Sequence, residues 1–211
     1  MSHADASLGS TPMRLRLPSG IPTLGGDKRA RVWERPPMFP KVFQTARLIL
    51  RPVAPADAQP IFDGYAQDPD VTRFLTWRPH TRIEQTEAYV ARCMEAASAC
   101  TYVLTERVGG KLIGAFDLRN SGQFRLGYGY VLARSSWGLG LMTEALTEVA
   151  CWALSQPDIW RIGDVCDVEN RASARVMEKA GLTCEGVARR WMMHPNVSDE
   201  PRDCFSYAKV R

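Results

Sequence analysis

The chain has 211 residues, of which 45% are hydrophobic, and this is enough to bury the core of one domain with an extension. Its net charge is +4 and its charged residues are interspersed, which fits an anionic ligand but gives no support for nucleic-acid binding. No segment reaches the roughly 18 to 20 apolar residues of a membrane span, and the first 22 residues lack a leader pattern. We therefore expect a cytoplasmic protein without a nucleic-acid or membrane partner.

Six cysteines are spread along the chain: Cys93, Cys100, Cys151, Cys166, Cys184 and Cys204. They form no C-x-x-C pair, and no histidine lies at metal-ligand spacing from them. This scatter predicts no metal site. It indicates small buried apolar side chains in a reducing compartment.

The first 40 residues are rich in Gly, Pro, Ser and Arg and show no sustained periodicity. We predict a flexible N-terminal arm over residues 1–40 and one folded domain over residues 41–211. The basic residues of the arm fit a solvated tail better than a partner-binding segment.

The folded part begins with apolar alternation at 45–53, which predicts a strand that Pro52 stops. Helical spacing follows at 54–68, with Asp57 as the expected N-cap, and again at 81–99. Two further strands are then expected on either side of a turn at Gly109 and Gly110.

The second half predicts a long strand at 124–133 and a helix at 143–154. A strand at 159–168, a short helix ended by Gly181 and two final strands complete the order. Because hairpins alternate with strand-helix-strand crossovers, the fold class is α+β, or mixed α/β, around one central sheet.

A G-x-G pair, Gly138 and Gly140, lies between the long strand and the helix that follows it. A helix start has free N–H groups and partial positive charge, and glycine lets a phosphate approach the backbone closely. The chain has no G-x-x-x-x-G-K-[ST] motif there and no third glycine of G-x-G-x-x-G, which excludes the common nucleotide-binding motifs. The glycine pair alone does not decide between a purely structural turn and an anion-binding site.

The segments GYVLARSSWGLGLMTEAL (129–146) and DVENRASARVMEKAGLTCEGVARR (167–190) resemble the GNAT superfamily of acetyl-CoA-dependent N-acetyltransferases. Within it, the chain is most similar to the branch that acetylates protein N-termini, the ribosomal-protein alanine acetyltransferases. The resemblance extends from about Thr45 to the C-terminus. It implies one GNAT-like domain, with helices flanking a central, mostly antiparallel sheet that contains a splayed pair of parallel strands.

The resemblance also implies a site for acetyl-CoA as acetyl donor, with no metal. Main-chain N–H groups of the glycine loop would bind the pyrophosphate, and Arg134 would reach a phosphate beside them. The expected loop donors are Trp137, Gly138, Leu139, Gly140, Leu141 and Met142. The pantetheine arm would lie between the splayed strands along Tyr130, Val131 and Leu132, whose N–H groups would hold the thioester carbonyl. Ordinary core packing is the alternative for these apolar residues.

Two further residues, Asn170 and Ser173, match the family's Asn-x-x-Ser motif at a helix start. The resemblance implies that Asn170 contacts the cofactor and that Ser173 donates to the leaving sulfur; a plain N-cap is the alternative. Many relatives place a tyrosine seven residues after the asparagine, where this chain has Met177. Ser173 is therefore the best remaining donor.

The general base is not identified by the sequence. Relatives often carry a glutamate where this chain has Gly127. Glu169, Asp117, His80 and water remain as candidates. Because an N-terminal α-amine has a pKa of about 7.7 to 8.0 and a lysine amine about 10.4, the missing base favours an α-amine acceptor.

Acceptor selection is expected from residues 72–81 and from the polar loop 194–203, which flank the cofactor cleft in relatives. The expected substrate contacts are Trp77, His80, Tyr128 and Trp191, with His194 beside them. The expected acceptor is a protein N-terminus or, as the alternative, a small amine such as a polyamine, an aminoglycoside or an amino acid derivative. A module that binds acetyl-CoA without turnover also remains open, and the protein is expected as a monomer or homodimer.

Overall fold

The computed structural model describes residues 39–211. The predicted arm lies outside the described residues except for its last two positions. These two contact the folded part, since the Tyr102 hydroxyl donates to the Pro40 carbonyl at 2.7 Å and the ring of Phe39 lies 6.5 Å from that of Trp152.

The strands are β1 (Phe43–Gln44), β2 (Leu48–Pro52), β3 (Ala99–Glu106), β4 (Leu112–Asn120), β5 (Arg125–Leu132), β6 (Arg161–Asp167), β7 (Thr183–Met192) and β8 (Arg202–Val210). The longer helices are α3 (Ile83–Glu95), α4 (Leu141–Ser155) and α5 (Arg171–Lys179). The short helical turns are η1 (Pro55–Asp57), α1 (Ala58–Ile61), η2 (Phe62–Ala66), α2 (Pro69–Thr72) and η3 (Arg134–Ser136).

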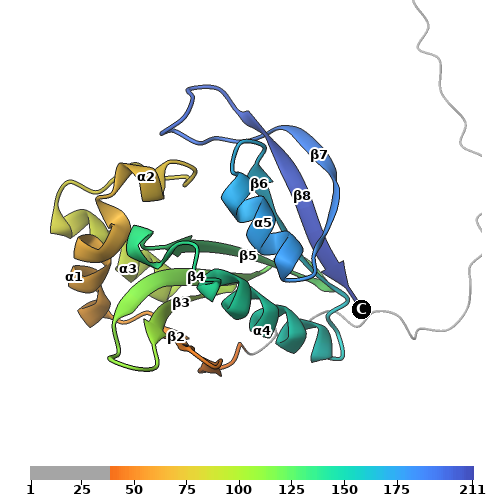
Figure 1. Cartoon of the computed structure of the whole chain (residues 1–211), viewed down its shortest axis with the longest axis horizontal. Coiled ribbons are helices and arrows are strands. Elements are labelled where there is room, and N and C mark those ends of the chain that lie inside the picture. The colour runs from red at the N-terminus through yellow and green to blue at the C-terminus, as the bar shows by residue number, and fades with distance from the viewer. Residues whose placement is uncertain (1–38) are drawn as a thin grey trace, which may run out of the picture. The chain divides into compact units, whose positions relative to one another are not determined.

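The eight strands form one sheet in the order β1-β2-β3-β4-β5-β6-β8-β7. All neighbouring strands are antiparallel except β5 and β6, which are parallel and pair only through Arg125 with Arg161 and Leu126 with Ile162. Figure 1 shows β6 and β8 turning away from β5 beyond this contact. The predicted fold class, a mostly antiparallel sheet with one splayed parallel pair, is confirmed.

The sheet has a hydrophobic core on each face because successive side chains of a strand point to opposite sides. On one face, side chains such as Tyr102 and Phe116 pack with those of α4 and α5. On the other, Val103 and Ala115 pack with the helical segments between β2 and β3. The helices α4 and α5 therefore pack on one face of the sheet, and the α1–α3 segments pack on the other.

Two predicted chain reversals are confirmed. Gly109 and Gly110 take positive φ angles of 84° and 66° in the hairpin between β3 and β4. After α5, Gly181 has φ 82°; its N–H donates to Glu178 O at 3.0 Å and the Leu182 N–H donates to Met177 O at 3.0 Å. These two bonds are those of a Schellman motif, which ends the helix there.

Three local expectations are met only in part. The segment predicted as one helix at 54–68 is divided into 3-10, α and π turns. Asp57 stands at the N-cap position of α1, but its side chain makes no bond to that helix; it accepts from the Ala54 N–H at 2.8 Å, at the start of η1, and from the Arg51 guanidinium. Of the six cysteines, all free, Cys151 and Cys184 are exposed instead of buried.

Candidate functional site

The glycine loop connects β5 to α4 through the short turn η3. Gly138 and Gly140 have φ angles of 75° and 74°, in the left-handed region. An L-residue with a side chain is strained there, by roughly 1–2 kcal/mol. A Cβ atom at position 138 would meet no atom within 4 Å, so backbone conformation and not crowding requires glycine at that position.

A row of main-chain N–H groups at residues 138–143 has no acceptor within the described part of the chain. The N–H of Trp137, in contrast, donates to Arg134 O at 3.1 Å, and the first helical bond of α4 runs from Glu144 N to Gly140 O at 3.0 Å. Of the predicted loop donors, Trp137 alone is engaged in a turn. The free row at a helix N-terminus fits a phosphate or another anion.

The gap between β5 and β6 is opened by a side chain. The N–H of Tyr128 donates to Asp164 Oδ2 at 3.0 Å, so a β6 carboxylate takes the place of a main-chain partner. Since alternate residues of an antiparallel strand direct their main-chain groups to the same side, the N–H groups of Tyr130 and Leu132 also face the gap. The N–H of Val131 faces β4 instead.

Two further bonds agree with this alternation. The N–H of Ala133, two residues beyond Val131, donates to Ile113 O at 2.7 Å next to β4. On the gap side, the Leu132 carbonyl accepts from the indole Nε1 of Trp137 at 2.7 Å. The free main-chain donors inside the gap are thus those of Tyr130 and Leu132.

A pair of hydroxyl groups connects β5 to α5. Tyr130 Oη lies 2.8 Å from Ser173 Oγ and also donates to the Ser173 carbonyl at 3.3 Å. Asn170 is the N-cap of α5, and its Oδ1 accepts from the Ser173 N–H at 3.1 Å. Met177, one turn further along α5, is buried in the core. The predicted motif residues Asn170 and Ser173 therefore lie together, with Tyr130 as a partner that spacing in the sequence did not indicate.

The space beside Gly127 is filled by other side chains. A Cβ atom at this position would collide with Ser121 Oγ and lie 3.3 Å from both Arg119 Nε and Asp164 Oδ2. Arg119 links two carboxylates: its Nη1 donates to Asp117 Oδ2 at 2.8 Å and its Nη2 donates to Asp164. The side chains of Ser121, Arg119 and Asp164 thus crowd position 127.

The two carboxylates next to Arg119 differ in burial. Burial raises the pKa of Asp164, although the Arg119 charge and two main-chain N–H groups act in the opposite direction. Asp117 is about one third exposed and also accepts from Thr101 Oγ1 at 3.1 Å. Both carboxylates, that of the base candidate Asp117 and that of Asp164, are therefore held by hydrogen bonds.

The other base candidates lie in separate surroundings. His80 Nδ1 lies 2.8 Å from Thr86 Oγ1, and burial lowers the pKa of His80. Glu169 is exposed and forms an ion pair with Arg202 at 2.8 Å. Asp117 of β4 is thus linked through Arg119 to Asp164 of β6, whereas Glu169 follows the end of β6 and is paired with Arg202.

The two segments expected to select the acceptor contact each other. Asn196 Nδ2 donates to the carbonyls of Thr72 and Trp77, each at 2.8 Å, which joins the loop between β7 and β8 to the segment after α2. The ring of Trp77 lies 4.7 Å from that of His80 and 5.9 Å from that of Tyr89. This aromatic cluster lies at the start of the segment that leads into α3.

The remaining predicted residues fall in contrasting places. Trp191 is exposed, whereas Tyr128 is 1% exposed and stacks on Tyr130 with an interplanar angle of 9°. Arg134 forms an ion pair with Asp70 of α2. The Tyr128 side chain therefore belongs to the core.

His194 is almost fully buried, and neither ring nitrogen has a hydrogen-bond partner within residues 39–211. Its Nε2 lies 3.9 Å from Asp167 Oδ2, and its ring meets that of Phe74 edge to face at 6.2 Å. Burial lowers the pKa of His194, and the nearby Asp167 charge acts in the opposite direction. His194 therefore packs the loop before β8 against the segment after α2.

Residues 39–211 contain neither a candidate membrane span nor a candidate metal site. None of the described helices is long and apolar enough to cross a bilayer. No group of three or more His, Cys, Asp or Glu side chains among these residues is arranged to hold a metal ion.

The acetyltransferase (GNAT) domain family matches residues 47–183, a range that includes β2, the glycine loop and α5. The chain belongs to the GNAT acetyltransferase family. The family and its named relatives make it an acetyl-CoA-dependent N-acetyltransferase. The resemblance to the GNAT superfamily seen in the sequence is therefore confirmed.

One similar relative is the uncharacterized N-acetyltransferase YoaA of Bacillus subtilis (strain 168), which is 30% identical over 179 residues, or 82% of this chain and 99% of YoaA. A solved GNAT acetyltransferase from Bacillus anthracis superposes with a TM-score of 0.71 at 24% identity, covering 80% of this chain and 98% of its own. RimL, named a ribosomal L7/L12 α-N-protein acetyltransferase and solved with coenzyme A, has a TM-score of 0.70 at 20% identity, with 80% and 97% covered. These likenesses to solved GNAT structures establish the shared fold.

Proposed function

We propose that this GNAT chain transfers the acetyl group of acetyl-CoA directly to the N-terminal α-amine of a protein or peptide. The observation that carries the choice of acceptor is that the two carboxylates next to Arg119, those of Asp117 and Asp164, are both hydrogen-bonded to it. An amine that is partly neutral at pH 7 needs no strong base, and an N-terminal α-amine, with a pKa of about 7.7 to 8.0, meets this condition better than lysine.

The free N–H row of residues 138–143 is the proposed seat of the diphosphate. Its position at the start of α4 adds the favourable end of the helix dipole. Acetyl-CoA supplies the acetyl group as an activated thioester. The gap-facing N–H groups of Tyr130 and Leu132 are placed to hold the thioester carbonyl oxygen as it gains negative charge.

Ser173 is the proposed hydrogen-bond donor to the leaving sulfur, and Asn170 holds it at the start of α5. In the transfer a bond forms between the amine nitrogen and the acetyl carbon, and the carbon–sulfur bond breaks. The amine loses one proton to water, and the thiolate, whose conjugate acid has a pKa of about 8.5, gains one to leave as a thiol. For Ser173 to direct its hydrogen toward the sulfur, the Tyr130 hydroxyl has to donate to Ser173 Oγ, which lies 2.8 Å from it.

The acceptor is proposed to enter past the exposed Trp191 and the segment that carries Trp77 and His80. Two facts support a peptide here: the loop before β8 is bonded to that segment through Asn196, and the structural neighbour RimL is named an α-N-protein acetyltransferase. The buried Tyr128 is assigned to packing of the gap and not to the acceptor.

A small-amine acceptor is the alternative. The structural neighbour MccE, a microcin C7 self-immunity acetyltransferase, was solved with acetyl-CoA and AMP, and it matches with a TM-score of 0.70 at 20% identity. A polycation would need free carboxylates, but Glu200 of the polar loop is paired with Arg190 at 3.1 Å. One acidic side chain of the polar loop is therefore already paired with a cation.

The donor site is tested by calorimetry with acetyl-CoA on the unaltered protein, Gly138→Glu and Gly109→Glu. Both substitutions place the same side chain at a glycine with positive φ and open space around it, but only Gly138 lies in the glycine loop. Because a carboxylate at the seat repels the diphosphate, we expect binding to be lost in Gly138→Glu and kept in Gly109→Glu. Equal binding by both variants would overturn the proposed seat, and no binding by the unaltered protein would overturn the proposed function.

A further inference from the structure

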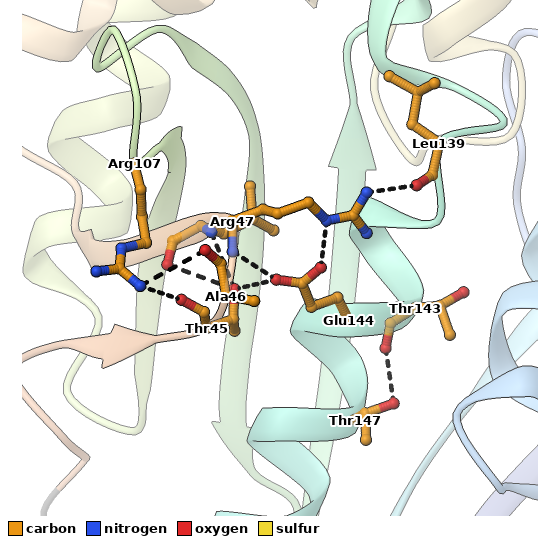
Figure 2. A network of polar contacts seen from close by, with 9 residues as sticks. Thr45, Ala46, Arg47, Arg107, Leu139, Thr143, Glu144 and Thr147 are labelled. Atoms are coloured by element: carbon orange, nitrogen blue, oxygen red, sulfur yellow. Dashed lines mark hydrogen bonds and ion pairs between the residues drawn. The ribbon is translucent and has the colours of Figure 1, made fainter.

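Arg47, at the residue before β2, reaches the glycine loop from a strand far away in the sequence (Figure 2). Its Nη1 donates to the Leu139 carbonyl at 2.9 Å, and its Nε donates to Glu144 Oε2 at 2.6 Å. One guanidinium thus contacts both the middle of the loop and the first turn of α4.

The bond to Leu139 fixes the direction of a peptide group. All described peptide bonds are trans, so the carbonyl of Leu139 and the N–H of Gly140 point in opposite directions. With the carbonyl held by Arg47, the Gly140 N–H is turned to the other side of the peptide, into the free row at the start of α4. Glycine at this position has other accessible conformations, so an external contact has to select this one.

A second contact concerns charge. Glu144 lies in the first turn of α4, where a carboxylate opposes a bound anion unless it is neutralised. Thr45 Oγ1 donates to Glu144 at 2.5 Å and the Arg47 N–H donates to it at 2.8 Å, in addition to the guanidinium. Burial raises the pKa of Glu144, but these hydrogen bonds outweigh burial and lower it, so the carboxylate is ionised and held toward Arg47.

One nitrogen of the Arg47 guanidinium makes no hydrogen bond to residues 39–211. Arg47 Nη2 has no hydrogen-bond partner among residues 39–211 and lies 3.8 Å from where a Cβ atom of Gly140 would be. About half of the Arg47 side chain is exposed, so the nitrogen is accessible from the loop side.

We propose that Arg47 is a positioning residue for the diphosphate of the acetyl donor, acting through the Leu139 carbonyl and the Glu144 carboxylate. This inference rests on the proposed function, because it assumes that the glycine loop binds that diphosphate. Arg47 orders the Gly140 N–H before the ligand arrives and cancels the nearest negative charge. It thereby lowers the cost of ordering the loop on binding.

The test compares Arg47→Ala, Arg47→Lys and Arg107→Ala by calorimetry with two ligands, acetyl-CoA and acetyl-pantetheine, which lacks the diphosphate. Arg107 is the matched control, because its Nη1 donates to the Thr45 carbonyl at 3.1 Å in the same segment but it has no bond to the loop (Figure 2). We expect Arg47→Ala to weaken the binding of acetyl-CoA about tenfold and to leave the affinity for acetyl-pantetheine unchanged. Arg107→Ala should change neither affinity.

Arg47→Lys keeps the positive charge, but an ammonium group cannot reproduce the fork-shaped contacts of the guanidinium with Leu139 and Glu144. Its loss of affinity for acetyl-CoA should therefore be intermediate. It also gives an answer if the alanine variant fails to fold. Equal losses for both ligands, or an unchanged affinity for acetyl-CoA in both Arg47 variants, would overturn the inference while leaving the proposed function intact. If the unaltered protein binds no acetyl-CoA, the proposed function fails and the inference fails with it.

Discussion

The hydroxyl groups of Tyr130 and Ser173 lie 2.8 Å apart and join β5 to the first turn of α5. Burial raises the pKa of Tyr130, so its hydroxyl stays protonated at neutral pH and serves as a donor. When it donates to Ser173 Oγ, the serine hydrogen is free to point elsewhere. In the proposed mechanism, the pair is the source of the hydrogen bond to the leaving sulfur.

Replacing either hydroxyl should slow transfer without weakening the donor complex. We expect Ser173→Ala to lower kcat about a hundredfold and Tyr130→Phe about tenfold, with similar KM values for acetyl-CoA. The double variant should be no slower than Ser173→Ala, because both residues act through one hydrogen bond. Steady-state release of coenzyme A thiol measures all three.

Tyr207→Phe is the matched control for Tyr130→Phe. Its hydroxyl also bonds a residue of α5, Glu178, at 3.2 Å, but it lies one strand away from the gap. A drop in kcat for the control equal to that for Tyr130→Phe would show that the loss reflects packing of α5 alone.

The register of β4 against β5 should be sensitive to one methyl group. A Cβ atom at Gly114 would collide with the carbonyl oxygen of Val131. This oxygen is part of the backbone of β5 and cannot easily move away. We expect Gly114→Ala to lower the free energy of unfolding by about 1–3 kcal/mol. Gly64→Ala, where a Cβ atom meets nothing within 4 Å, should be neutral or slightly stabilising, by about 0.4–1 kcal/mol. Urea denaturation compares the two, and equal midpoints would contradict the register.

Burial of His194 should make the fold sensitive to mild acid. Because its pKa in the folded state is lowered, the unfolded chain, in which histidine titrates near pH 6.5, binds the proton more readily. The contribution of the neutral His194 to stability is therefore fully present above about pH 6.5 and is lost as the pH falls below this value. The thermal unfolding midpoint of His194→Gln should fall less between pH 7.5 and about 5.5 than that of the unaltered protein. A fall due to His80, whose pKa is also lowered, should remain. An identical pH slope in the variant would contradict this assignment.

The contact between the two acceptor segments can be tested apart from the donor site. Asn196→Ala removes both bonds to the carbonyls of Thr72 and Trp77. We expect the KM for an acceptor peptide to rise several-fold, because two carbonyls lose a partner and the loop before β8 loosens. The Kd for acetyl-CoA should not change, and a change confined to the Kd would reject the role.

Much of the fold follows from local pattern. Alternation located the strands, and glycines with positive φ marked the hairpin at Gly109 and the end of α5 at Gly181. The helix predicted at 54–68 is divided into turns of different types, and the side chain of Asp57, which was expected to cap it, is bonded to Arg51. Propensity describes a segment alone, whereas this partner comes from a neighbouring strand.

The candidate site could be located but not completed from the sequence. The glycine loop and the Asn170–Ser173 motif are contiguous, so spacing revealed them. The contacts of Arg47 with Glu144 and of Arg119 with Asp164 join residues 97 and 45 positions apart, and only the folded sheet brings them together. Likewise, the choice of Tyr130 and Leu132 over Val131 as gap-facing donors depends on register, which one sequence does not reveal.

The central claim, an α-amine acceptor, is tested most directly by mass spectrometry of one peptide that carries both a free N-terminus and an internal lysine. The peptide is incubated with the protein and acetyl-CoA. Parallel reactions contain the same peptide with a blocked N-terminus or one of a panel of small amines. We predict one acetyl group on the α-amine, no reaction of the blocked peptide and slower reaction of the small amines. Acetylation of the lysine in the blocked peptide, or of small amines alone, would contradict the account.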